Sequence, residues 1–87
     1  MSAIRFVEVS ACVHDHYDGI VASGVKASEA NSFGVYLRRG TPDEHYADWV
    51  ADCIDQPTAT ILAEGLQRHH GVHNPIIFNI QPETDDG

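Results

Sequence analysis

Cysteine and histidine side chains are spaced in this sequence so that they could meet at a metal ion. Three of them alternate near the N-terminus, so that on a β-strand they would project from one face. The other three cluster where a helix is expected to end. Thiolate and imidazole groups together suit Zn²⁺ or a similar metal. The six residues are Cys12, His14, His16, His69, His70 and His73.

The spacing of these residues matches no known zinc motif, because the sequence has no Cys-x-x-Cys and no His-Glu-x-x-His. Histidines on the solvated face of a strand and at a helix end explain the same pattern. We therefore expect no metal or other cofactor. A small metal-binding or metal-sensing protein that uses the Cys and His cluster is the alternative, if the helix end lies beside the first strand.

Nucleophilic chemistry is a second option, with Cys12 or Cys53 beside a histidine and Asp15. Neither cysteine lies in a nucleophile-elbow pattern, and a chain of 87 residues rarely forms a deep catalytic cleft. Two cysteines in a reducing compartment are most often small buried side chains. The glycines form no phosphate-binding loop, and no apolar pocket is evident for an acid–base carboxyl pair. The sequence therefore predicts a protein that is not an enzyme.

Charge is the strongest functional signal. Five Lys and Arg stand against thirteen Asp and Glu, which gives a formal net charge of −8. Direct binding of nucleic acid or of an anionic membrane needs clustered cations, so we expect the protein to bind neither. The sequence has no basic and apolar leader and no apolar run near the length of a membrane span. We therefore expect a cytoplasmic protein.

A dense group of carboxylates follows residue 42. If 46–53 is a strand, Asp48 and Asp52 are expected on its outer face, with Asp55 at the start of the next helix. Carboxylates at this density attract basic protein surfaces, and the commonest such surfaces belong to nucleic-acid-binding proteins and complexes. Solubility alone also explains the charge, and the sequence leaves a homodimer open. The predicted partner-binding residues are Asp43, Glu44, Asp48, Asp52 and Asp55.

In size, acidity, alanine-rich core and lack of a catalytic signature, the chain resembles the small accessory proteins of phages and mobile elements, of which the anti-CRISPR proteins are the best known. The resemblance extends over the whole chain and rests on no specific residue, so it transfers no functional position. It implies an inhibitor that blocks a nucleic-acid-binding groove in place of phosphate.

Hydrophobic alternation predicts the elements that would position these groups. Residues 4–16 alternate as a strand with a buried odd-numbered face, Val7, Val9, Ala11 and Val13. Asp18-Gly19 is typical of a two-residue hairpin turn, which would pair Cys12 with Val25 and Val13 with Gly24. A return strand over 20–25 and a further strand over 33–39 follow.

The region 44–54 fits either a strand or a second helix, and its alternation slightly favours the strand. Trp49 lies on the apolar side in both cases, so we expect it in the core. A helix over 57–70, capped by Asp55 or Gln56 and ended by Gly71, should bury Ala59, Leu62, Ala63, Leu66 and His70.

A last strand over 76–80 completes the predicted fold. It is an α+β domain, with an antiparallel sheet of about four to five strands packed on one main helix. The domain should span 1–81, followed by an acidic, disordered tail at 82–87.

Overall fold

The computed structural model describes residues 3–41 and 43–84. It has the α+β fold expected from the sequence, with strands and one long helix. The region that fitted either a strand or a helix is a strand, and the short polar segment before the third strand forms a single 3₁₀ turn, Ala27–Glu29. In chain order the other elements are β1 (Ile4–Asp15), β2 (Gly19–Ser23), β3 (Ser32–Gly40), β4 (His45–Cys53), α1 (Gln56–His70) and β5 (Ile77–Asn79).

The sheet is built around β1. Its antiparallel order is β2-β1-β3-β4, and β5 pairs in parallel with β1. The strands β2 and β5 share one side of β1, since β2 pairs along 12–15 and β5 along 8–10. Along 8–10 and at Cys12, β1 is therefore paired on both sides. The strand β4 ends the order on the other side.

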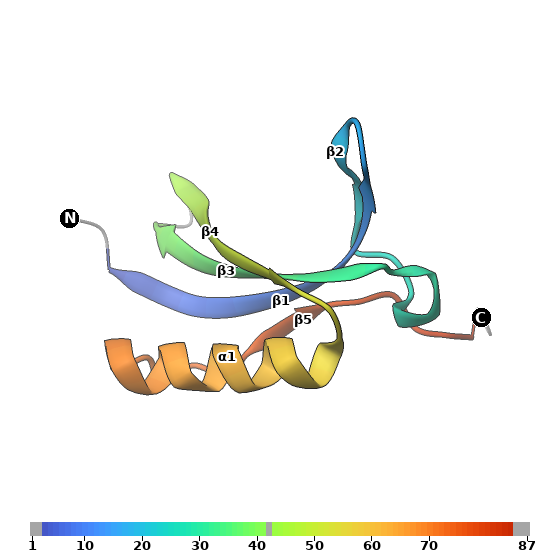
Figure 1. The fold of residues 1–87 in the computed structure, drawn as a ribbon. Helices are drawn as coiled ribbons and strands as arrows, with labels where there is room; N and C mark the ends of the chain where they lie inside the picture. The colour runs from blue at the N-terminus through green and yellow to red at the C-terminus, as the bar shows by residue number, and fades with distance from the viewer. Residues whose placement is uncertain (1–2, 42, 85–87) are drawn as a thin grey trace.

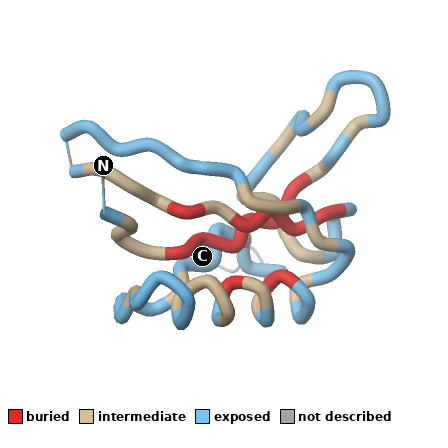
Figure 2. The backbone as a smooth tube through the Cα atoms, turned by 60° about the vertical axis from the view of Figure 1, so that its left-hand side comes forward, coloured by how far each residue is buried: buried red, intermediate tan, exposed pale blue. Residues whose placement is uncertain are grey.

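The core lies between one face of the sheet and α1. Figure 1 shows α1 running beneath β1 and β3, and Figure 2 shows the buried segments in the strands above the helix. The odd-numbered face of β1 is buried as predicted, except that Val13 is only half-buried. The buried cluster consists of Val7, Val9, Ala11, Phe33, Val35, Leu37, Ala59 and Ala63.

The helix α1 confirms the capping signals in the sequence. The Asp55 carboxylate accepts a hydrogen bond from the backbone N–H of Thr58 at 2.8 Å, and Gly71 ends the helix with φ +67°. Because the sheet approaches α1 closely, its fully buried positions are alanines, while Leu62 and Leu66 pack beside them. The expectation that His70 belongs to the core is wrong, since its side chain is exposed.

The first hairpin turns differently from the expected two-residue turn. Its loop has three residues, 16–18, and only Gly19 takes a positive φ, of 76°. The reason is the Asp15 carboxylate, which accepts hydrogen bonds from the N–H groups of Tyr17 (2.7 Å) and Asp18 (3.0 Å). This local bonding favours a turn that ends in one left-handed glycine, in place of the Asp-Gly turn that needs two positive φ angles.

The strand register shifts with the turn. Cys12 pairs with Ser23, where the two-residue turn predicted Val25. Val13 pairs with Ala22, which is displaced in the same direction from the predicted Gly24. A further irregularity separates Val13 from His14, so the strict alternation of β1 ends before its histidines.

A β-bulge in β4 reverses the expected sides of its residues. The pairing passes from Val35↔Ala51 to Tyr36↔Trp49, which leaves Val50 as the extra residue, packed toward the core. Trp49 therefore lies on the sheet face away from α1 and is 61% exposed, so the expectation of a core tryptophan is wrong.

Two other sequence expectations concern the ends of the chain and the membrane. Of the predicted tail at 82–87, residues 82–84 are exposed and the Glu83 carboxylate accepts a hydrogen bond from the Ser28 N–H at 3.3 Å, while 85–87 lie outside the described residues. Within 3–41 and 43–84, no helix has the length and apolar character needed to cross a membrane.

Candidate binding face

The sheet face away from α1 is the candidate functional surface. The β1–β2 hairpin and the β3–β4 hairpin both rise on this side, so the face is curved between them (Figure 1). Because directly paired residues share a face, the strand register identifies its members. We call this surface the helix-free face, and it carries Phe6, Glu8, Ser10, Cys12, Ser32, Gly34, Tyr36, Arg38, Trp49, Asp52, Ile77 and Asn79.

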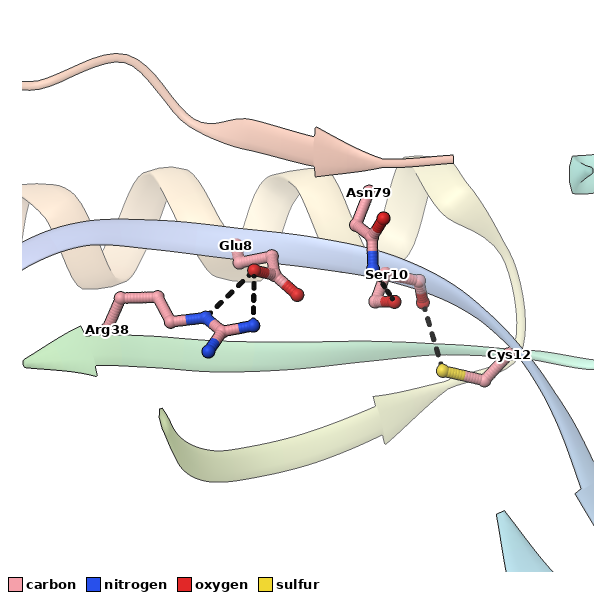
Figure 3. Close-up of polar contacts among 5 residues, drawn as sticks. All are labelled: Glu8, Ser10, Cys12, Arg38 and Asn79. Atoms are coloured by element: carbon pink, nitrogen blue, oxygen red, sulfur yellow. Dashed lines mark hydrogen bonds and ion pairs between the residues drawn. The ribbon is translucent and has the colours of Figure 1, made fainter. Parts of the chain in front are cut away.

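An ion pair lies near one end of the helix-free face. Arg38 on β3 donates from Nε and Nη2 to the same oxygen of Glu8, at 2.8 Å in both cases (Figure 3). Glu8 is only 6% exposed, so the guanidinium compensates a carboxylate that has lost most of its water. The pair borders an open hollow of about 440 Å³, which Arg5, Phe6 and His45 also line.

The centre of the face is polar and closely bonded. Asn79 on β5 donates from Nδ2 to the Ser10 hydroxyl at 3.1 Å, and the Cys12 thiol donates to the Ser10 carbonyl at 3.4 Å (Figure 3). Ser10 and Cys12 are buried, although the sequence alternation places them opposite the core. They are buried because β1 is interior to a curved sheet, where side chains from β3 and β5 cover it.

Tyr36 on β3 is an aromatic residue of the helix-free face. An added methyl group at Gly34 would lie 2.8 Å from the Tyr36 ring, so the ring crosses the strand where only glycine leaves room. Its hydroxyl reaches the Cys12 thiol. Burial raises the pKa of the Tyr36 hydroxyl, and the nearby Cys12 and Asp52 raise it further. This hydroxyl therefore remains a neutral donor at physiological pH.

Trp49 stands beside Tyr36 on β4. Its indole N–H donates to Asp52 Oδ1 at 3.1 Å, which fixes both side chains on the helix-free face. The bond leaves Oδ2 of Asp52 available. A large exposed aromatic residue beside a carboxylate is typical of protein interfaces, where one side of the ring is apolar and its N–H is satisfied.

A second hollow of about 440 Å³ opens at the end of the face near the first hairpin. Its lining residues are His14, His16, Asn31, Ser32 and Asp52. Asn31 binds the backbone of His14 twice, accepting from its N–H at 2.7 Å and donating to its carbonyl at 2.9 Å. The Ser32 hydroxyl is buried and has no hydrogen-bond partner among the described residues. We call this site the Ser32 hollow.

The two groups of candidate metal ligands, which belong to the alternative prediction, do not meet. The residues that follow α1 lie at the start of β1, where the Asn74 side chain binds the Arg5 carbonyl, whereas His14 and His16 lie at the other end of that strand. Figure 1 shows the end of α1 and the β1–β2 hairpin on opposite sides of the molecule. In the described part of the chain, no three Cys, His, Asp or Glu side chains are grouped to hold a metal ion.

The remaining candidate ligands have other contacts or stand free of one another. The rings of His69 and His70 meet edge to face with their centroids 4.8 Å apart, and His73 is exposed beside them. Both cysteines are unpaired, Cys12 being buried and Cys53 half-buried. Burial raises the pKa of the Cys53 thiol, and the nearby Asp52 and Asp55 raise it further, so little thiolate is available for nucleophilic attack.

The five predicted partner-binding carboxylates follow β4 and its two ends, but they do not share a face. Asp43 and Glu44 are exposed where β3 leads into β4. Asp48 binds Arg39 Nε at 2.6 Å on the side of the sheet that faces α1, and Asp55 caps α1. Asp52 alone lies on the helix-free face, because the bulge at Val50 places it opposite Asp48.

Several residues of the helix-free face were not among those predicted from the sequence. Glu8 and Ser10 interrupt the apolar residues of a central strand, and this interruption is the one signal that could have identified them. Nothing in the sequence marks the Ser32 hydroxyl or the Tyr36 ring, since their roles depend on how β3 and β4 are paired. Comparisons with family models, with curated proteins and with solved structures found no match to this chain.

Proposed function

We propose that this protein is a non-enzymatic binding module that holds a basic surface of another protein against β4 and the helix-free face. One observation carries the proposal. The terminal strand of the sheet, β4, presents an exposed tryptophan, Trp49, whose indole N–H is hydrogen-bonded to one carboxylate. Other carboxylates precede and follow Trp49 along the chain. Exposed aromatic residues supply binding free energy, and surrounding carboxylates select a basic partner.

The charge distribution supports a basic partner. Within residues 3–41 and 43–84, neither Asp43, Glu44 nor Asp52 forms a salt bridge with a lysine or arginine. Arg38 and Arg39, the cations nearest to β4, already bind Glu8 and Asp48. The β4 side of the molecule therefore has excess negative charge in addition to its exposed aromatic groups.

The position of β4 supports the same proposal. As the terminal strand of the sheet it offers backbone N–H and C=O groups along its outer side, and Tyr46 and Trp49 are both exposed on it. Carboxylates disfavour pairing between two copies of such an edge, because like charges would approach one another. The same carboxylates favour a segment that carries lysine or arginine.

Among proteins in a cell, nucleic-acid-binding proteins have the most strongly basic surfaces. An acidic module that occupies such a surface competes with phosphate for the same cations. We therefore propose an inhibitor of a nucleic-acid-binding protein or complex, in agreement with the resemblance to phage and mobile-element accessory proteins.

A matched pair of charge variants tests the proposal. One variant carries Asp43→Asn, Glu44→Gln and Asp52→Asn, and the control carries Asp18→Asn, Glu29→Gln and Glu64→Gln on other surfaces. Both lose the same charge, so solubility and overall attraction change equally. Each protein is used to capture partners from a cell lysate at about 0.05 M and about 0.5 M salt, where screening differs strongly.

We expect the wild type and the control to retain a common partner at low salt, and the β4 variant to lose it. The captured protein is then purified, and its binding to a labelled oligonucleotide is measured with and without the module. Release of the oligonucleotide by the wild type, but not by the β4 variant, supports the proposal. Equal capture by both triple variants would show that the charge acts without a defined surface.

A further inference from the structure

Resting on the proposed basic partner, we infer that the Ser32 hollow receives one arginine side chain of that partner. The hollow lies beside Trp49 at the end of the helix-free face, and Asp52 is both a wall of the hollow and the hydrogen-bond acceptor of the Trp49 indole. The aromatic surface and the hollow are thus one continuous site.

The Ser32 hydroxyl is the first indication of a ligand. Its oxygen is fully covered, it has no partner in the described part of the chain, and the residue is only 9% exposed. A buried hydroxyl without a hydrogen bond costs free energy, so a native structure that keeps one usually offers it to a ligand or to water. Ser32 pairs with Cys12 and therefore projects toward the helix-free face.

Asp52 is the second indication. The indole N–H of Trp49 occupies Oδ1 and orients the carboxylate, which lines the hollow and has no other hydrogen-bond partner in the described part of the chain. A hydroxyl and a carboxylate oxygen make a set of acceptors. Arginine carries five N–H donors in a fixed planar arrangement, so one guanidinium satisfies both groups at once.

The rest of the site favours the same occupant. No lysine or arginine is among the residues that line the Ser32 hollow, whereas the hollow at the other end of the face contains Arg5 and Arg38. The hollow at one end of the helix-free face is therefore lined by the protein's own arginines, whereas the Ser32 hollow has no lysine or arginine in its lining. The planar guanidinium group of arginine stacks on an indole ring better than the compact ammonium group of lysine does. Trp49 therefore favours arginine over lysine.

Hydrogen bonds within the protein hold the backbone around the Ser32 hollow in place without a ligand. Asn31 ties the segment before β3 to the His14 backbone through two hydrogen bonds, so the walls on β1 and β3 keep their separation. The covered Ser32 hydroxyl must rotate toward the hollow to meet a ligand, but the backbone around it need not move, and a site that needs little rearrangement loses less free energy on binding.

Short peptides provide the test. The probe is acetylated hexa-arginine, with hexalysine and hexacitrulline of equal length as comparisons, at pH 8, above the range in which imidazole ordinarily gains a proton. Trp49 is the only tryptophan, so its fluorescence reports directly on the site. Binding is measured by fluorescence and by calorimetry for the wild type, Ser32→Ala, Asp52→Asn and the control Glu64→Gln.

We expect hexa-arginine to bind more tightly than hexalysine, and hexacitrulline not to bind. Asp52→Asn should weaken hexa-arginine binding about tenfold and Ser32→Ala about fivefold, by loss of a charged and of a neutral hydrogen bond. Glu64→Gln removes the same charge as Asp52→Asn on the exposed side of α1, outside the hollow, and should change binding less than about twofold. Ser32→Ala removes an unbonded hydroxyl, so the variant should fold as the wild type does.

The outcomes separate the hollow from the proposed function. If hexa-arginine binds and all three variants weaken it equally, or hexalysine binds as tightly with the same response to the variants, the arginine site is wrong while a basic partner stands. If neither cationic peptide binds at low salt, the site is overturned together with the basic partner on which it rests. Weakening that is confined to Ser32→Ala and Asp52→Asn supports the site.

Discussion

Asp48 and Asp52 lie on opposite faces of β4, Asp48 paired with Leu37 and Asp52 paired with Gly34. The bulge at Val50 causes this, because one extra residue reverses the side on which every earlier residue of the strand projects. The two carboxylates therefore have different roles. Asp48 binds Arg39 within the protein, whereas Asp52 holds Trp49 on the face that we propose for binding.

The same reversal leads to a prediction about Trp49. Because its ring is mostly exposed, Trp49→Ala should lower the free energy of unfolding by less than about 1 kcal/mol. Leu37→Ala, on the opposite face and buried in the core, should lower it by about 2–5 kcal/mol. Urea denaturation followed by far-ultraviolet circular dichroism compares the two. A Trp49→Ala variant as unstable as Leu37→Ala would place the ring in the core after all.

Glu8 and Arg38 should behave as a coupled pair. Arg38→Leu leaves the buried Glu8 carboxylate without its cation and should cost about 2–4 kcal/mol, somewhat below the value for a fully buried pair because Arg38 is partly exposed. The double variant Glu8→Leu/Arg38→Leu should regain much of that loss. Equilibrium unfolding of the two single variants and the double variant gives the coupling energy. Losses that simply add would mean that the two side chains do not depend on each other.

Gly34 is predicted to be essential for the position of Tyr36. Gly34→Ala places a methyl group against the Tyr36 ring and should destabilise the protein by about 1–3 kcal/mol. Gly34→Ala/Tyr36→Ala removes the crowding, so adding the alanine at 34 to a Tyr36→Ala protein should cost much less. Nuclear magnetic resonance signals of the Tyr36 ring should shift in Gly34→Ala. An unshifted ring with an unchanged melting temperature would exclude the close contact.

The cap of α1 should give a pH-dependent contribution to stability. Hydrogen bonds from the Thr58 side chain and backbone hold the pKa of Asp55 below its usual value. A carboxyl group with a lowered folded pKa stabilises the protein above its unfolded pKa of about 3.9, and this contribution is lost as pH falls through the folded value. Asp55→Ala should therefore lower Tm at pH 7, with a difference that narrows below about pH 4.

Asp55→Asn is the matched control for the cap, because asparagine accepts the same hydrogen bond without titrating. Its Tm at pH 7 should lie between those of the wild type and Asp55→Ala, and its difference from Asp55→Ala should not change as pH falls. Thermal unfolding of the three proteins from pH 7 to pH 3 measures the effect. A gap between wild type and Asp55→Ala that stays constant over this range would mean that the carboxylate charge has no part in the cap.

The sequence was sufficient for most elements of the fold, since those depend on local signals. Asp55, Pro57 and Gly71 are an N-cap, a first-turn proline and a left-handed stop, and the helix runs between them. Alternation predicted the other strands, but over 44–54 it only slightly favoured a strand, because the spacing there also suited a helix. What fixes the choice there is pairing with β3, a long-range contact that no single stretch of sequence contains.

The candidate binding face was harder to predict, because it depends on single irregularities. A bulge at one residue moved Trp49 from the core to the surface and separated Asp48 from Asp52. Burial of Ser10 depends on Asn79, which is 69 residues away in the sequence. Neither a bulge nor a contact between such distant positions changes the periodicity of a strand, so sequence patterns alone could not reveal them.

The pairing of β5 with β1 has a consequence for synthesis on the ribosome. The strand that is made first takes its partner along 8–10 from residues 77–79, and the Asn79 side chain arrives over Ser10 only then. Until residue 79 leaves the exit tunnel, β1 lacks its neighbour along 8–10, and this unpaired stretch is open to non-native contacts. Closure of the sheet must therefore follow, and cannot accompany, production of most of the domain.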